Sequence, residues 1–278
     1  MKLVFIGTGG GRVNLIKQWR GTGGFLIKGS LVFHIDPGPG ALSNMVRLKE
    51  NPLKTDVIVV THNHIDHCSD AAVLCEAMTY YGLKKRGILI GSKNALEGDE
   101  KGDKALSLYH QNLPLKRIVA TNGTKIEEKM NSKSFMMEII GLRHDEPSNF
   151  GFKLHHEGET LGYISDTEYF SDLGLLFKEC DCLVINNLKP KGSGIPDHLS
   201  SEDTIEILKV AKPNLCILTH LGMKFFKNPA WLEAQKITDA TGVKTIAAKD
   251  GGKYELDGDL FKSESKPKST KRLSDFND

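Results

Sequence analysis

THNHIDHCSD, residues 61–70, holds three histidines and two aspartates within ten positions, in a chain of 278 residues that has ten histidines. The segment before it, DVIVVTH (56–62), is apolar and β-branched, which is typical of a buried central strand. The segment after it, DAAVLCEAMTYYGL (70–83), has the spacing of an amphipathic helix, with Ser69 as a candidate N-cap. The stretch therefore predicts a polar turn between a strand and a helix.

The spacing inside this turn indicates metal binding. His62 and His64 are two positions apart, so an extended segment directs both side chains to the same side. Asp66 and His67 follow one turn later and can face a second point nearby, a spacing that suits two metal ions better than one. Imidazole and carboxylate ligands together favour zinc, manganese or iron over calcium or magnesium. A solvent-facing polar turn is the alternative, and it accounts for a single histidine better than for this whole string.

Three more predicted strands end in a side chain that can bind a metal. They are FMMEIIGLRH (135–144), the second strand of the hairpin GFKLHHEGETLGYISD (151–166), and LCILTH (215–220). Strand ends are rigid, and the loops at one edge of a sheet often carry a binding site. We therefore expect the side chains at four strand ends to meet at one point: His62, His144, Asp166 and His220.

Strands and helices alternate over the rest of the chain, and hairpins occur among them. Further strands are predicted at 3–6, 24–29, 30–36, 87–91 and 182–186, and further helices at 41–50 and 201–211. Hairpins exclude a purely parallel doubly wound sheet and favour a mixed layering of helices and sheets. Residues 92–134 are polar and weakly patterned, which predicts loop and short helix there.

The domain organisation is expected to be simple. The last apolar segments, KTIAAKDG and KYEL, end near residue 256, so we expect one domain over residues 1–260. The segment that follows, 261–278, is polar with few apolar groups, a composition that cannot bury enough apolar surface to fold. It is therefore expected to be a disordered tail.

Composition limits the class of protein. Apolar residues make up 39% and charged residues 26%, and the net charge of +2 does not by itself demand a nucleic-acid partner. No apolar stretch reaches the roughly 18 residues that a membrane span needs, and MKLVFIGTGGG at the N-terminus lacks the features of a signal peptide. The five cysteines are odd in number, which favours reduced thiols over a disulfide framework. We expect a cytoplasmic protein without a membrane partner.

The ordered motifs resemble those of the metallo-β-lactamase-fold superfamily over about residues 1–256. The H-x-H-x-D-H motif of that family occurs at 62–67, and the later single ligands match GLRHDE, YISDTE and LTHLG. The early glycine motif and the HIDPG stretch, which contains Asp36, fit as well. The resemblance implies an α+β fold, a four-layer αββα sandwich with two mixed sheets.

The resemblance also implies a site for two divalent metal ions, with zinc expected and manganese or iron as alternatives. One ion would be held by His62, His64 and His144, the other by Asp66, His67 and His220, and Asp166 would bridge the two. Asp36 would orient a ligand, although an aspartate that merely turns the chain before Pro37 fits the sequence nearly as well. The ions would generate a metal-bound hydroxide as nucleophile, with Asp66 accepting a proton or orienting it.

His198 points to a branch of the family. It occurs in IPDHLSSEDTIEIL, which resembles the H-[LS]-[ST] element of the ribonuclease Z and cyclic phosphodiesterase branch. In that branch the histidine contacts phosphate and helps to protonate the leaving oxygen, which a departing alkoxide needs. The alternative is a loop histidine that only caps a helix or faces solvent.

The leading hypothesis is a dinuclear metal-dependent phosphodiesterase that acts on a cyclic or nucleotide-like phosphodiester. The alternatives are a tRNA-end-processing nuclease of the ribonuclease Z kind, with RNA as partner, and a thioester or lactone hydrolase. The expected arm for tRNA is not obvious, although residues 92–134 could contain it. A non-enzymatic metal-binding module is disfavoured, because a closed structural zinc site needs only four ligands and seven candidates are present. A homodimer is expected from the resemblance.

Overall fold

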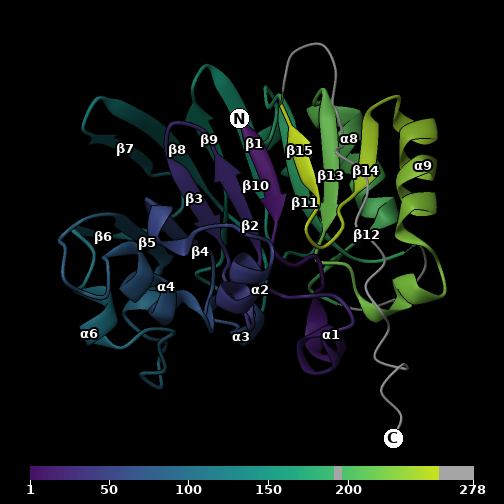
Figure 1. The fold of residues 1–278 in the computed structure, drawn as a ribbon. Helices are drawn as coiled ribbons and strands as arrows, with labels where there is room; N and C mark the ends of the chain where they lie inside the picture. The colour runs from purple at the N-terminus through teal and green to yellow at the C-terminus, as the bar shows by residue number, and fades with distance from the viewer. Residues whose placement is uncertain (191–195, 257–278) are drawn as a thin grey trace, which may run out of the picture.

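Two mixed β-sheets form the centre of the computed structural model, which describes residues 1–190 and 196–256 (Figure 1). The strand order is β15-β1-β2-β3-β4-β5-β6 in the first sheet and β14-β13-β11-β10-β9-β8-β7 in the second, where β12 pairs with β11. Helices cover the outer face of each sheet (Figure 1). The predicted four-layer αββα sandwich with two mixed sheets is confirmed.

The first sheet is antiparallel at one side and parallel at the other. Successive strands from β15 through β1 and β2 to β3 pair antiparallel, and those from β3 through β4 and β5 to β6 pair in parallel. Its strands are β1 (Lys2–Phe5), β2 (Phe25–Lys28), β3 (Val32–Ile35), β4 (Val57–Val60), β5 (Ile88–Ser92), β6 (Lys116–Ala120) and β15 (Lys253–Glu255).

The second sheet has the same division. Strands β7 to β10 pair antiparallel, whereas β10, β11, β13 and β14 pair in parallel. Its strands are β7 (Lys125–Met130), β8 (Lys133–Gly141), β9 (Phe150–His156), β10 (Glu159–Ile164), β11 (Cys182–Lys189), β12 (Leu199–Ser200), β13 (Leu215–Thr219) and β14 (Lys244–Ala247).

Short helices connect the strands on both sides. Those that follow strands of the first sheet are α1 (Gly11–Lys17), α2 (Ala41–Arg47), η1 (Pro52–Lys54), α3 (Ile65–Cys68), α4 (Ala71–Met78), α5 (Lys93–Leu96) and α6 (Leu108–Gln111). Those on the second sheet's side are α7 (Leu173–Leu176), α8 (Ser201–Ala211), η2 (Met223–Phe226) and α9 (Ala230–Thr241). None of the helices within the described ranges has the length and apolar character that a membrane crossing requires.

Strand β1 shows why the sequence predicts buried strands without a clear alternation. Leu3 and Phe5 face the core between the two sheets, whereas Val4 and Ile6 face the helices that cover the first sheet. Because successive side chains point to opposite faces and both faces are buried, the strand is a continuous apolar run. This covering fixes the strands rigidly, so the loops at their ends are held in constant positions.

The interpretation of residues 92–134 as loop and short helix was wrong in part. Two short helices occur there, but β6 and β7 are strands, and β8 begins at Lys133. Both missed strands lie at sheet edges and carry charged side chains, as in KRIVA and KIEEKM. Edge strands are commonly protected by such charges, which remove the apolar pattern that identifies a strand. The tail predicted over 261–278 lies outside the described residues.

Candidate metal centre

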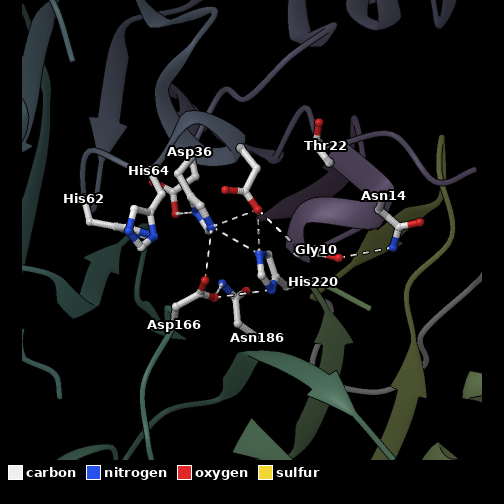
Figure 2. Close-up of polar contacts among 12 residues, drawn as sticks. Gly10, Asn14, Thr22, Asp36, His62, His64, Asp166, Asn186 and His220 are labelled. Carbon is white, nitrogen blue, oxygen red and sulfur yellow. Dashed lines mark hydrogen bonds and ion pairs between the residues drawn. The ribbon is translucent and has the colours of Figure 1, made fainter. Parts of the chain in front are cut away.

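The seven predicted metal ligands converge at one edge of the sandwich, where the loops after β4, β8, β10 and β13 meet. Figure 2 shows four of them, His62, His64, Asp166 and His220. The strands end one to three residues before His62, His144, Asp166 and His220, for example at Gly141 rather than at His144. These four ligands therefore lie on the first residues of loops that rigid strands position, whereas Asp66 and His67 lie on α3. The converging residues are His62, His64, Asp66, His67, His144, Asp166 and His220.

Three histidines form the first group of ligands. The candidate ligand atoms of His62, His64 and His144 all lie within 4.8 Å of one another. Nε2 of His144 is 3.3 Å from Nδ1 of His64. Nδ1 of His144 donates to the carbonyl of Asp197 at 3.0 Å, so the lone pair of His144 Nε2 faces the group. These three residues match one of the two predicted ligand sets.

The second group contains one carboxylate and two histidines. The candidate ligand atoms of Asp66, His67 and His220 also lie within 4.8 Å of one another. Nε2 of His67 and Nε2 of His220 are 3.1 Å apart, and Oδ2 of Asp66 is 3.4 Å from the latter. Asp66 and His67 lie on α3, one turn beyond His64, so a single short segment contributes to both groups.

Asp166 lies between the two groups. Its Oδ2 is 3.4 Å from Nε2 of His67, and its Oδ1 is 3.3 Å from Nδ1 of His220. It also lies within ligand distance of His62 and of His144. The carboxylate thus reaches members of both groups, as a bridging ligand must.

Asp36 orients the ligands from behind. Its Oδ2 accepts hydrogen bonds from Nδ1 of His67 at 3.1 Å, from the hydroxyl of Thr61 at 2.8 Å and from the hydroxyl of Tyr163 at 2.9 Å. Because a carboxylate only accepts, Nδ1 of His67 carries the proton and Nε2 faces the cluster. Asp36 also has a φ of 49°, so it turns the chain as well as holding a ligand.

The environment of His62 tests whether a metal fits. Since the Thr61 hydroxyl donates its proton to Asp36, it accepts from Nδ1 of His62 at 3.1 Å. Nε2 of His62 therefore carries a lone pair, and this atom is buried with no hydrogen-bond partner. Leaving such an atom unsatisfied costs about 1–3 kcal/mol, which a metal ligand bond would offset. The donor set fits a divalent transition-metal ion.

The charges of the cluster are unevenly divided. Burial alone would raise the pKa of Asp166, but His220 and His67 hold it well below its usual range. Burial alone would lower the pKa of His67, but Asp166 and Asp66 raise it well above its usual range. For His62, burial and the neighbouring His67 lower the pKa far below normal. Without metal, a proton on His67 thus supplies positive charge between carboxylates, where bound cations would supply it instead.

His198 lies on the more open side of the cluster, where the sequence predicted it. Its Nε2 is 3.3 Å from Oδ2 of Asp166, and its Nδ1 donates to the carbonyl of Pro196 at 3.0 Å. Burial opposes its protonation, but the hydrogen bond to Asp166 raises its pKa overall. A histidine that carries a proton and is partly exposed can serve as a proton donor. Its catalytic role stays a prediction.

Two further residues contact the candidate ligands. The first is Gly10, from the early glycine motif, where an added Cβ would lie 2.1 Å from Nδ1 of His220, so only glycine allows this approach. The second is Asn186, whose Nδ2 donates to Oδ1 of Asp166 at 2.8 Å (Figure 2). An asparagine at the end of the apolar run CLVIN was a usable signal. Asn186 was missed in the sequence because an amide is not a usual ligand of these metals and its partner Asp166 lies 20 positions away.

Asp145 adds a further carboxylate at the rim. Its side chain is 60% exposed, and its Oδ1 is 3.0 Å from Nε2 of His144 and 3.5 Å from Nε2 of His64. It therefore contacts the first ligand group from the solvent side. No pattern in GLRHDE distinguishes Asp145 from the neighbouring Glu146.

Comparisons with known proteins give the same family in sequence and in fold. The sequence model of the Beta-lactamase superfamily domain matches residues 32–221. An uncharacterized protein of Methanocaldococcus jannaschii is 35% identical, with 92% of this chain and 95% of that protein covered. A UPF0173 metal-dependent hydrolase of Pelotomaculum thermopropionicum is 26% identical over 72% and 81% of the two chains. A ribonuclease Z of Thermococcus kodakarensis is 22% identical over 80% and 85%.

Solved structures share the fold. The metallo-beta-lactamase fold protein YhfI from Bacillus subtilis superposes with a TM-score of 0.71 at 19% identity, covering 91% of this chain and 98% of that one. The short form of human tRNase Z superposes with a TM-score of 0.66 at 15% identity, covering 92% and 100%. At these identities the similarity concerns the fold alone.

Proposed function

The chain belongs to the beta-lactamase superfamily and is a metal-dependent hydrolase, and on this premise we propose that it is a dinuclear phosphodiesterase acting on a cyclic or nucleotide-like phosphodiester. The two ligand groups and the carboxylate between them support a pair of ions rather than one. Zinc is the expected metal, with manganese and iron as alternatives, because imidazole nitrogens dominate the donor set.

The proposed ligand sets follow the geometry of the site. His62, His64 and His144 would hold one ion; Asp66, His67 and His220 would hold the other; Asp166 would bridge them. When bound, such ions lower the pKa of water and stabilise negative charge on phosphoryl oxygens. Asp36 fixes the tautomer of His67 directly and that of His62 through Thr61, so both imidazoles present a lone pair to the cluster.

Two side chains of the chain would move protons. Oδ2 of Asp66 faces His220 at 3.4 Å and the backbone amide of Gly11 at 3.3 Å, so this ionised carboxylate is held in place to accept a proton from the attacking water. His198 would donate a proton to the leaving oxygen from the opposite, more exposed side. Its Nε2 is held towards the cluster by Asp166.

The position and raised pKa of His198 are the observation that carries this proposal. An alkoxide that leaves a phosphodiester needs a proton, whereas a thiolate does not, so a proton donor beside the cluster favours the phosphodiester over a thioester. Lactone hydrolysis also releases an alkoxide, so the proton donor does not distinguish a lactone from a phosphodiester. Only an assay of both substrates distinguishes them.

Processing of tRNA ends is the second candidate. The relative named ribonuclease Z favours it. Against it, residues 92–134, where an RNA-binding arm could have been inserted, contribute β6, β7 and two short helices to the domain instead. We therefore keep a smaller nucleotide-like substrate as the leading proposal, with RNA as a candidate substrate. A homodimer remains an expectation from the resemblance.

Metal analysis paired with a phosphodiesterase assay tests the proposal. We expect two metal ions per chain and hydrolysis of bis-p-nitrophenyl phosphate in preference to chromogenic thioester and lactone substrates. His198→Ala is expected to slow cleavage of a phosphodiester with an alkoxide leaving group, such as a cyclic nucleotide, by about 10²–10⁴-fold while the metal content stays the same. Cleavage of bis-p-nitrophenyl phosphate should fall less, because its phenolate leaving group needs little protonation. Full activity of His198→Ala would contradict the assignment to the phosphodiesterase branch. Faster hydrolysis of the thioester or lactone by the wild-type protein would contradict a phosphodiester as the substrate.

A further inference from the structure

Aromatic and basic side chains are exposed together on α1, on the turn after it and on η2. We call this the α1–η2 surface and define it by the exposed Ile16, Lys17, Trp19, Met223 and Phe226 and the half-buried Arg20. Helix α1 packs against η2, so the two segments form one continuous face although more than 200 positions separate them in the chain. The proposed mechanism uses none of these side chains.

Two aromatic rings are the centre of this surface. Trp19 is 56% exposed and Phe226 is 50% exposed. Their ring centroids are 4.9 Å apart with an interplanar angle of 79°, an edge-to-face pair. The guanidinium carbon of Arg20 lies 5.9 Å from the centroid of the Phe226 ring. The rings hold each other in place, and about half of each side chain stays exposed to solvent.

The charge around the rings has one sign. Residues 7–27 contain Arg12, Lys17 and Arg20 and no acidic residue, and residues 221–232 contain Lys224 and Lys227 and no acidic residue. The whole chain has a net charge of only +2, so this concentration is local.

One acidic residue from another element faces the patch. Asp250 lies near Arg20, and its carboxylate accepts hydrogen bonds from the backbone amides of Thr8 at 2.8 Å and Gly21 at 2.7 Å. The charge of Asp250 offsets one of the five cations in the two segments, so the face keeps a net positive charge. The surface therefore suits an anionic partner.

The α1–η2 surface is continuous with the metal centre. Gly10 packs on the ring of His220, and Nδ2 of Asn14 on α1 donates to the carbonyl of Gly10 at 3.2 Å (Figure 2). The same nitrogen donates to the carbonyl of Leu221 at 2.7 Å. Helix η2 begins three residues after His220, at Met223. The same two segments thus carry part of the metal centre at one end and the exposed rings at the other, so a ligand on the rings can extend to the metals.

We propose that the α1–η2 surface binds single-stranded nucleic acid, with bases stacked on Trp19 and Phe226 and with the adjoining phosphodiester directed to the metal centre. Exposed aromatic faces among cations are what a single strand requires, because stacking is tolerant of sequence and the cations attract the backbone. Self-association through this face would bring like charges together, which disfavours a second copy as its occupant. The inference rests on the proposed phosphodiesterase activity, and it favours a single strand, the second candidate substrate, over the smaller nucleotide-like one.

Fluorescence offers a direct test, because the chain has only two tryptophans. Trp231→Phe leaves Trp19 as the single reporter. Titration of the metal-loaded, full-length Trp231→Phe protein with single-stranded oligoadenylate of about ten nucleotides should quench the Trp19 emission in a saturable way. Emission that stays unchanged while anisotropy of a labelled oligoadenylate shows binding would contradict stacking on Trp19.

Single substitutions distinguish base stacking on the two rings from non-specific electrostatic attraction. Trp19→Ala and Phe226→Ala should each weaken oligoadenylate binding about 5- to 150-fold, and Trp19→Phe should restore most of the affinity. Tyr109→Ala is the matched control, because Tyr109 is 63% exposed on α6, outside this surface, and its loss should change nothing. Lys17→Gln should make the slope of log binding constant against log salt concentration less steep, by about the amount that one phosphate contact contributes.

The outcomes distinguish this inference from the proposed function. If wild-type protein does not hydrolyse bis-p-nitrophenyl phosphate but oligoadenylate binding depends on Trp19, the proposed function fails and the surface stands as a binding site. If hydrolysis occurs but neither aromatic substitution changes the affinity, the inference is overturned. It is overturned as well if the substitutions convert a dimer to a monomer by light scattering without changing the affinity.

Discussion

Nδ2 of Asn186 donates a hydrogen bond to Oδ1 of Asp166 at 2.8 Å, and both side chains are buried. Oδ1 of the same amide is 3.2 Å from the hydroxyl of Tyr163, which is also 2.9 Å from Asp36. One amide therefore connects the carboxylate that lies between the two ligand groups with the carboxylate that orients His67. A buried polar chain of this kind fixes its members only while every link is present.

Asn186→Leu should weaken metal binding. The substitution keeps the side-chain volume similar but removes the donor that holds Asp166, and losing such a supporting partner typically lowers metal affinity about 10–100-fold. Zinc affinity measured by competition with a chromogenic chelator gives the result. Asn187→Leu is the matched control: Asn187 is equally buried but bonds to Ser201 and Thr204, so it should cost stability without changing zinc affinity. Equal zinc affinities for both variants and the wild type would contradict the role given to Asn186.

Gly10→Ala should disable the second ligand group. Gly10 has an ordinary extended backbone with a φ of −134°, so alanine introduces no backbone strain there. Its Cβ would instead meet the ring of His220, 2.1 Å from Nδ1, and the imidazole must move. We expect the metal content, measured by inductively coupled plasma mass spectrometry, to fall from about two ions towards one.

The control for Gly10→Ala is Gly158→Ala. Gly158 lies in the β9–β10 turn with a φ of 77° and with open space around it, so alanine strains the backbone without touching the metal centre. This variant should lose about 1 kcal/mol of stability and keep both metals. A full complement of two metals in Gly10→Ala would show that His220 is not held as described.

Metal removal should lower the thermal stability of the protein. A metal that binds only the folded chain stabilises it by about 2.7 kcal/mol at a free concentration of 100 times its dissociation constant. For a chain of this size, that difference shifts the unfolding temperature by about 2–4 °C per kcal/mol. Calorimetry with zinc and with excess chelator measures the shift. Identical unfolding temperatures under the two conditions would argue against a metal at this cluster.

The ligands on the turn after β4 were predictable from the sequence, and so was the position of the site in the fold. His62, His64, Asp66 and His67 lie within six positions, so their geometry follows from one turn of chain. The more distant ligands were found because each follows a buried apolar run, and the sandwich brings those strand ends to one edge. The fold class was predictable for the same reason, since buried strands and amphipathic helices leave strong patterns.

What escaped prediction depends on contacts between distant segments. The glycine motif indicated that the chain could approach the site, but not that Gly10 meets the ring of His220, because the loop after β1 packs on a ring 210 positions away. Strands β6 and β7 were missed because both lie at sheet edges and carry charged side chains, which hide the apolar pattern of a strand. Lys116 of β6 and Glu128 of β7 are examples, and they form an ion pair with each other. Helix boundaries were also too long: the helix predicted to Leu83 ends at Met78, because Tyr80 and Tyr81 have positive φ.

His34 gives the chain a specific sensitivity to acid. It is fully buried on β3, its Nε2 donates to the carbonyl of Gly23 at 2.8 Å, and its Nδ1 is buried without a partner. A second proton would have to go on that isolated Nδ1. Burial lowers the pKa of His34 to about 4, against the weaker opposing effects of the Gly23 carbonyl and Asp36.

The stability that neutral His34 provides should therefore be lost between pH 6.5 and pH 4. The folded pKa lies below the unfolded value of about 6.5, so the unfolded chain binds the extra proton first and stability falls as the pH falls. The expected loss at pH 4 is about 3 kcal/mol relative to pH 7.5.

His34→Gln can keep the bond to Gly23 but does not titrate, so the stability advantage of wild type over the variant should shrink by that amount across this window. Urea unfolding of both proteins in constant excess chelator measures it, because the other histidines then titrate alike in each. A difference between the two proteins that stays constant from pH 7.5 to pH 4 would show that His34 is protonated in the folded chain.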